Sequence, residues 1–243
     1  MKIYAVGTSC TWFERNNTSF ILDDDMLFDT PNGSYKFIIK QTDILKLRAI
    51  FISHFHSDHY ADIHIIATRI MREANKIGKT QKLKMFGPKG MLDKLIDINV
   101  VFCSAEDELD RENYLRAIDF VEVGDGDEFK FGGYKIKVYA LDHGDVYSQG
   151  YTFTDKNGKT IAFTADTKDC DNLRKMLSVS DVVFVDMSSN VPSKTHLDAK
   201  CFVKLMKKYP NCKMYPVHTS DETYEFARKN GMNLISDGET LIV

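Results

Sequence analysis

Four side chains of the kind that ligate transition metals fall within a stretch of six residues. They are His54, His56, Asp58 and His59. In an extended chain, alternation would place the first three on one side, and a turn could bring His59 beside them. Imidazole and carboxylate groups suit zinc or a similar first-row metal, and a set without thiolates is typical of an open catalytic site. The alternative interpretation is a polar loop at a strand end, which would not need four such groups together.

Three more candidate ligands each follow a predicted strand. The strands and their ligands are 134–141 with His143, 160–164 with Asp166, and 213–217 with His218. Ligands gather beyond the carboxyl ends of strands in open sheets, so these residues would meet the first cluster at one edge. Each histidine taken alone could instead make an ordinary structural hydrogen bond. Their shared position favours a common site.

The elements that would present these ligands alternate between strands and helices. Further strands are predicted over residues 2–7, 19–22, 26–28, 48–53, 83–86, 120–123, 128–131, 151–154, 181–186 and 240–243. Helices are predicted over 62–77 and 198–208, with another opening at Pro88, because proline suits the first turn of a helix. Hairpins mixed with strand-helix units predict an α+β (α/β) sandwich, in which helices cover the sheets.

Length and charge restrict the class of protein. A chain of 243 residues with 43% hydrophobic content can bury one large core, and it contains no repeat or low-complexity tract, so a single domain over residues 1–243 is expected. The net charge is −3 and the sequence pI is about 6.2. This balance lacks the basic excess of proteins that bind duplex nucleic acid mainly through phosphates.

The cysteines and the hydropathy pattern predict a cytoplasmic protein. Five scattered cysteines form no CxxC pair, and we interpret them as reduced thiols: Cys10, Cys103, Cys170, Cys201 and Cys212. The first residues enter a strand-like pattern at once, which leaves no room for a secretory leader. No window approaches the length of a membrane span.

The order of the candidate ligands resembles the metallo-β-lactamase superfamily, whose signature HxHxDH is followed by a lone histidine, a lone aspartate and a final histidine. The match runs from Met1 to about Ser220. It implies a four-layer αβ/βα sandwich with two divalent metal ions at the sheet edges, and these ligands accept zinc, with manganese or iron as alternatives. One metal would be held by His54, His56 and His143, the other by Asp58, His59 and His218, with Asp166 bridging both.

Weaker signals resemble the branch that contains tRNase Z and the cyclic phosphate phosphodiesterases. They are the segments 7–9, 15–19 and 27–30. A stronger one is His196, 22 residues before His218, where that branch carries an extra histidine near the reacting phosphate. His196 would be a general acid or would stabilise the phosphate; alternatively, it makes a surface hydrogen bond at a helix start. The predicted catalytic residues are Asp58, Asp166 and His196.

The resemblance favours a phosphodiesterase in which a metal-bridging hydroxide, oriented by Asp166, attacks a small or cyclic phosphodiester or a short RNA. Only 22 residues separate His143 from Asp166, which leaves no space for the long arm with which tRNase Z grips tRNA. Two alternatives stay open: hydrolysis of a carboxylic ester, thioester or lactone, and a metal-stabilised binding module. A homodimer is the assembly that the resemblance suggests.

Three further features have two interpretations each. Residues 69–94 hold eight Lys or Arg against two acids, which could contact a polyanion or form a solvated face. Asp29 either orients a ligand histidine from behind or belongs to a plain turn before Pro31. Four aromatic residues could line a substrate pocket or pack within loops: Trp12, Phe13, Tyr60 and Tyr147.

Overall fold

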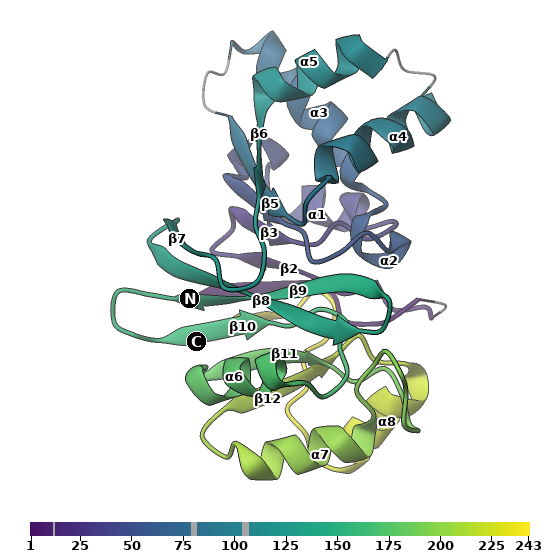
Figure 1. The fold of residues 1–243 in the computed structure, drawn as a ribbon, viewed down its shortest axis with the longest axis vertical. Coiled ribbons are helices and arrows are strands. Elements are labelled where there is room, and N and C mark those ends of the chain that lie inside the picture. The colour runs from purple at the N-terminus through teal and green to yellow at the C-terminus, as the bar shows by residue number, and fades with distance from the viewer. Residues whose placement is uncertain (12, 79–81, 104–106) are drawn as a thin grey trace.

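Two β-sheets pack face to face, and helices cover their outer faces (Figure 1). This arrangement is seen in a computed structural model, which describes residues 1–11, 13–78, 82–103 and 107–243. The predicted four-layer sandwich is therefore confirmed. No helix in the described ranges is long and apolar enough to cross a membrane.

The first sheet has seven strands in the order β13-β1-β2-β3-β4-β5-β6. Their bounds are β1 Lys2–Gly7, β2 Ser19–Leu22, β3 Met26–Phe28, β4 Ala49–Phe51, β5 Leu83–Gly87, β6 Ile118–Glu122 and β13 Thr240–Ile242. Strands β3 to β6 are parallel, and Ile50 of β4 lies between Leu27 and Met85 in register. Every residue of β4 is buried, as expected for a parallel strand covered on both faces.

The second sheet has six strands in the order β12-β11-β10-β9-β8-β7. Their bounds are β7 Glu128–Phe131, β8 Tyr134–His143, β9 Val146–Thr154, β10 Thr160–Phe163, β11 Val182–Asp186 and β12 Lys213–Val217. Strands β10, β11 and β12 are parallel, whereas β7, β8 and β9 form an antiparallel meander. An aromatic cluster fills the space between the sheets, with Phe20 and Phe163 in contact at 5.1 Å between ring centroids.

Eight α-helices and a short 3₁₀ helix are found in the described ranges. They are α1 Tyr35–Gln41, η1 Ile44–Lys46, α2 Ser57–Tyr60, α3 Ile63–Lys76, α4 Met91–Cys103, α5 Asp107–Ala117, α6 Asp171–Val179, α7 Ala199–Lys208 and α8 Asp221–Lys229. Helices α3 to α5 lie outside the first sheet, and α6 to α8 outside the second (Figure 1). In α7, Asp198 caps the first turn and Phe202 and Leu205 face the core, as the predicted amphipathic helix requires.

Several predicted boundaries were wrong. The strand predicted over 151–154 begins at Val146, because its pairing with β8 starts at that residue. The helix expected at Pro88 begins at Met91, because Gly90 has a φ of 85° and so lies outside the right-handed helical region. The strand predicted over 134–141 continues to His143, since its pairing with β9 extends to the end of the hairpin. Four of the five cysteines are described as free, and the side chain of Cys103 lies outside the described part.

Candidate metal centre

The carboxyl ends of four strands meet at one edge of the two sheets. β4 of the first sheet leads into His54 and His56, whereas β8, β10 and β12 of the second lead to His143, Asp166 and His218. Strands β8 and β10 both run antiparallel to β9, and β12 follows the direction of β10, so all three point to the same edge. The structure thus brings together the strand-end residues that the sequence predicted as ligands.

Asp58 and His59 reach the same edge through a single helical turn. Helix α2 begins directly after His56, and the backbone N–H of His59 donates to the carbonyl of His56 at 2.9 Å. Both side chains are buried. The turn expected after the extended segment therefore takes the form of one helical turn.

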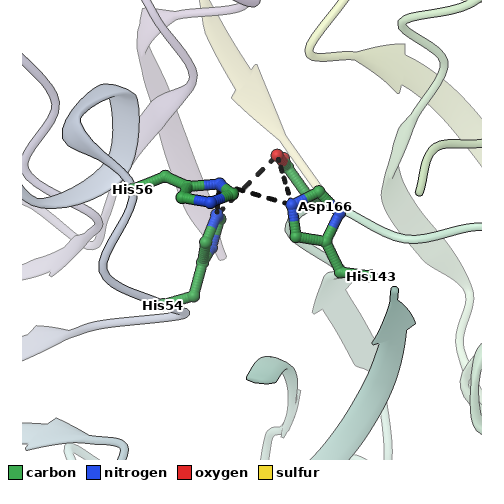
Figure 2. Close-up of side chains that lie close together, drawn as sticks. All are labelled: His54, His56, His143 and Asp166. Carbon is green, nitrogen blue, oxygen red and sulfur yellow. Dashed lines mark hydrogen bonds and ion pairs between the residues drawn. The ribbon is translucent and has the colours of Figure 1, made fainter. Parts of the chain in front are cut away.

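The first group of side chains contains His54, His56, His143 and Asp166 (Figure 2). The Nδ1 of His56 lies 3.2 Å from the Nε2 of His54 and 3.3 Å from the Nε2 of His143. The Oδ2 of Asp166 lies 3.7 Å from each of the latter two nitrogens. One ligand atom from each residue lies within 4.8 Å of the others, which is close enough to share one cation.

The second group contains Asp58, His59 and His218. The Nε2 of His218 lies 3.3 Å from the Oδ2 of Asp58 and 3.4 Å from the Oδ1 of Asp166. The same Asp166 oxygen lies 3.1 Å from the Nε2 of His59. Asp166 therefore stands between the groups, with Oδ1 toward this one and Oδ2 toward the first.

Among the residues that the structure describes, several buried polar atoms at this centre make no hydrogen bond. They include the Nε2 of His59 and the Oδ1 of Asp166. Leaving such atoms unsatisfied costs free energy, whereas a cation would satisfy both. Nitrogen and oxygen donors without sulfur also match the preferences of divalent first-row metals. The residues present therefore fit a divalent metal centre.

The electrostatic environment favours the ligating protonation states of two of these side chains. Burial alone would raise the pKa of Asp166, but the neighbouring His218, His59 and His54 lower it well below its usual range, so the side chain is a carboxylate. Burial lowers the pKa of His54, which keeps this imidazole neutral. For His59, the charges of Asp166 and Asp29 outweigh burial and raise the pKa, so a cation at Nε2 would take the place of a proton.

Asp29 holds ligand histidines of both groups from behind. Its Oδ2 lies 2.8 Å from the Nδ1 of His59 and accepts a hydrogen bond from the Oγ of Ser53 at 2.7 Å. That hydroxyl oxygen also lies 3.0 Å from the Nδ1 of His54. An imidazole that donates Nδ1–H in this way presents its Nε2 lone pair to the metal side. The orienting role suggested for Asp29 thus has a geometric basis, which a plain turn would not need.

Asn at position 29 should weaken metal binding by about 10–100-fold without unfolding the chain. Asp29 has a φ of 55°, a left-handed conformation that asparagine adopts more readily than alanine. The amide would keep the shape but lose the charge that fixes His59. We would measure metal affinity by competition with a chromogenic chelator.

The matched control is Asp24→Asn, because Asp24 also has a positive φ, 66°, but is exposed and pairs with Lys2. Its metal affinity should equal that of the wild type. Equal affinity in the Asp29→Asn protein would instead assign Asp29 to the turn alone.

His196 faces the same centre, supported by Asp186. Its Nδ1 lies 2.9 Å from the Oδ2 of Asp186 and 4.0 Å from the Oδ2 of Asp166, and its side chain is 25% exposed. Together with Asp58, Asp166 and His218 it lines a cavity of about 470 Å³. His196 therefore does not make the surface hydrogen bond that was the alternative interpretation.

The sequence did not predict Asp186, which together with Asp166, His196 and His218 forms a third group of possible ligands whose ligand atoms lie within 4.8 Å of one another. Asp186 is 1% exposed and accepts hydrogen bonds from the backbone N–H groups of Thr167 and Ser188 at 3.0 and 2.9 Å. Its Oδ1 also lies 3.7 Å from the Nδ1 of His218. It was assigned only as the end of a buried strand, although the strand-end rule applied to the other ligands would have indicated it.

The aromatic candidates divide among different roles. Phe13 lines the cavity of the metal centre. Tyr60 is buried and donates its hydroxyl to the carbonyl of Met91 at 2.7 Å, so it packs in the core. Tyr147 lies on a neighbouring cavity, and Trp12 lies outside the described residues.

Four of the eight basic residues in this stretch pair with nearby acids. Arg69 and Lys76 both pair with Glu73, and Lys82 and Lys84 both pair with Asp119. Another member of the stretch, at position 79, lies outside the described residues. These pairs favour the interpretation as a solvated face.

Comparisons with known proteins identify a matching family and similar chains. The family described as "Beta-lactamase superfamily domain" matches residues 27–219. The chain is similar to the Ribonuclease Z of Macrococcus caseolyticus, at 31% identity over 160 residues, covering 62% of this chain and 48% of that protein. It is also similar to the Ribonuclease Z of Archaeoglobus fulgidus, at 30% identity over 168 residues, covering 65% and 50%. The chain spans about half the length of these curated relatives.

Solved structures share the whole fold. The metallo-β-lactamase fold protein YhfI from Bacillus subtilis superposes with a TM-score of 0.78 at 16% identity, covering 99% of this chain and 98% of that one. The short form of human tRNase Z gives 0.75 at 16% identity, covering 100% and 99%. A diphosphatase of the PhnP family gives 0.76 at 18% identity, covering 100% and 97%. At these identities the likeness is one of fold.

Proposed function

The chain belongs to the β-lactamase superfamily domain family, and from this membership we propose that it is a phosphodiesterase with two divalent metal ions, zinc foremost, with manganese or iron as alternatives. His54, His56 and His143 would hold one ion, and Asp58, His59 and His218 the other. Asp166 would bridge them. The substrate would be a small or cyclic phosphodiester or a short RNA, handled by one domain that spans residues 1–243.

His196 is the observation that carries this proposal. Phosphodiester cleavage needs a group that protonates or shields the leaving oxygen, in addition to a nucleophile and charge neutralisation. His196 lines the same cavity as the ligands without being one of the seven predicted ones, and Asp186 fixes its ring at Nδ1. Its Nε2 is then the atom that can donate a proton. Hydrolysis of an activated ester or lactone would not require such an acid.

The residues of the chain would divide the chemistry among them. When bound, the two cations would lower the pKa of a water molecule and offset charge on the phosphoryl oxygens. Asp166 is a buried carboxylate between the groups, so it can orient the attacking water through a hydrogen bond. Asp186 holds His196 and stabilises its protonated form. His196 would give its proton to the leaving alkoxide.

The short connection after His143 favours small substrates. Between His143 and Asp166 the chain makes a tight turn at Gly144 and then forms β9 and β10. No segment there extends from the domain as a substrate-gripping arm. The Ribonuclease Z relatives support an RNA or related phosphodiester, and this geometry supports the smaller members of that class.

Purified protein should hydrolyse bis(p-nitrophenyl) phosphate with about two metal ions per chain. Release of p-nitrophenolate would be followed after manganese or zinc is added separately, with metal content determined on the same sample. p-Nitrophenyl acetate provides the comparison substrate, because it tests carbonyl chemistry with the same leaving group. A fully metallated sample that cleaves only the acetate would contradict the proposal and favour a carboxylic ester hydrolase.

A further inference from the structure

A second cavity opens beside the metal centre. Its volume is about 620 Å³, within the range of small-molecule pockets. His56 lines both this cavity and that of the metal centre, so the two share a wall. The new cavity, here termed the ring cavity, is formed by the segments that follow β4, β5 and β6 and by the start of β9.

The walls of the ring cavity are mostly apolar. Phe55 and Tyr147 contribute aromatic rings, and Pro88, Val123 and Val146 contribute aliphatic surface. Tyr147 is 48% exposed, and its hydroxyl donates to the Oε1 of Gln149 at 3.0 Å. Its ring is thus anchored while remaining accessible. A ligand phosphate would find few partners on such walls, whereas a flat ring could pack against them.

Two carboxylates line the same cavity, and each has one oxygen available. Glu122 accepts the backbone N–H of Gly90 through Oε1 at 2.7 Å, and Asp127 accepts that of Gly124 through Oδ2 at 2.8 Å. The second oxygen of each makes no hydrogen bond to a described residue. Carboxylates held by backbone groups in this way can accept hydrogen bonds from the amino groups of a nucleobase. An alkyl chain would make no use of them.

Lys89 balances these acids. Its side chain is exposed and lines the ring cavity, and it pairs with no acid among the residues that the structure describes. Its ammonium group offsets the negative charge of Glu122 and Asp127, so an anionic ligand can approach the cavity. The combination of flat apolar walls, carboxylate acceptors and one cation suits an amino-bearing base attached to a phosphate.

We propose that the ring cavity binds the nucleobase of a nucleotide whose phosphate lies at the metal centre. The inference rests on the proposed function, since it names the substrate class of the same site as a nucleotide phosphodiester. His56, which lines both cavities, would lie beneath the sugar that joins the base to the phosphate. Tyr147 would be a specificity-determining residue that packs against the base.

The proposal can be tested by binding, without turnover. Isothermal titration of the manganese-loaded protein would compare adenosine 5′-monophosphate with ribose 5-phosphate, which carries the same phosphate and sugar but no base. Adenosine 5′-monophosphate should bind about tenfold or more tightly, the size expected for stacking of one base on aromatic groups. In Tyr147→Ala this preference should shrink, while the affinity for ribose 5-phosphate stays unchanged. Tyr147→Phe keeps the ring and should retain the preference.

Equal affinity of the wild-type protein for the two ligands, or no measurable binding of either, would overturn the inference. So would an equal loss of affinity for both ligands in Tyr147→Ala. These results are separate from the proposed function, which is judged by cleavage of bis(p-nitrophenyl) phosphate. A protein that cleaves this diester but does not distinguish the two ligands would keep the phosphodiesterase and lose the nucleobase site.

Discussion

Replacing Asp166 by alanine is expected to abolish phosphodiester hydrolysis and to lower the metal content of the protein. The two oxygens of Asp166 face different ligand groups, with Oδ1 3.1 Å from the Nε2 of His59 and Oδ2 3.7 Å from that of His54. One substitution therefore removes a ligand from both groups. The loss should exceed the ~10–100-fold that accompanies changes behind the ligands, such as that expected at Asp29.

The domain itself should remain folded in Asp166→Ala. Strand β10, which presents this residue, is buried along its whole length and pairs with β9 and β11 through its own backbone. Metal content after dialysis and a thermal melt followed by circular dichroism would separate lost ligation from lost folding. Asp171→Ala is the matched control, because that side chain is 88% exposed at the start of α6. An active Asp166→Ala enzyme would contradict the two-metal proposal.

Replacing His196 by alanine should lower turnover of a phosphodiester with an alkoxide leaving group by about 10²–10⁴-fold while both metal ions stay bound. His196 pairs with Asp186 and lies 4.0 Å from the nearest Asp166 oxygen, and in the proposed mechanism it acts on the substrate while the seven predicted ligands hold the cations. Six of the seven histidines lie at the centre, and the seventh, His64, is placed by the carbonyl of Ala61 at 2.7 Å. His64→Ala is thus the control, with unchanged turnover. A fall in metal content of His196→Ala would reassign this residue as a ligand.

The pH profile provides a second readout for His196. Burial lowers its pKa, but the hydrogen bond and charge of Asp186 outweigh burial and raise it above the ordinary value. A general acid must be protonated, so kcat should fall as the pH rises through this pKa. Asp186→Asn removes the charge that stabilises the imidazolium, and the alkaline limb should move to lower pH. An unshifted limb in Asp186→Asn would argue that another group titrates there.

Much of the fold and the ligand set was predictable because both depend on short-range patterns. Buried strands such as β4 and β11 are continuous apolar runs, and the residue that follows a strand points to the sheet edge by topology alone. Asp186 was not predicted as a site residue because it completes such a run and resembles the polar end of any strand. Its role depends on His196, which approaches from 10 residues away through a loop.

Other features depend on contacts that no local pattern encodes. Helix α8 was not predicted, because its buried side chains are only Thr223 and Ala227, which form no apolar stripe. The left-handed backbone of Asp29 places its carboxylate behind His59, 30 residues along the chain. The sequence around Asp29 or His59 does not indicate this contact. It depends on the parallel pairing of β3 and β4, which brings the two segments together.

The two ligand groups each draw side chains from both halves of the sandwich. His54 and His56 follow a strand of the first sheet and His143 ends one of the second, while Asp58 and His59 face His218 in the same manner. A cation in either group would therefore link the two sheets to each other. Because neither half holds all the members of either of these two groups, binding there would be linked to the assembled fold, and at 100 times its dissociation constant an ion adds about 2.7 kcal/mol to stability. Removal of the ions by a chelator would therefore lower the stability of the packing between the two sheets as well as abolish activity.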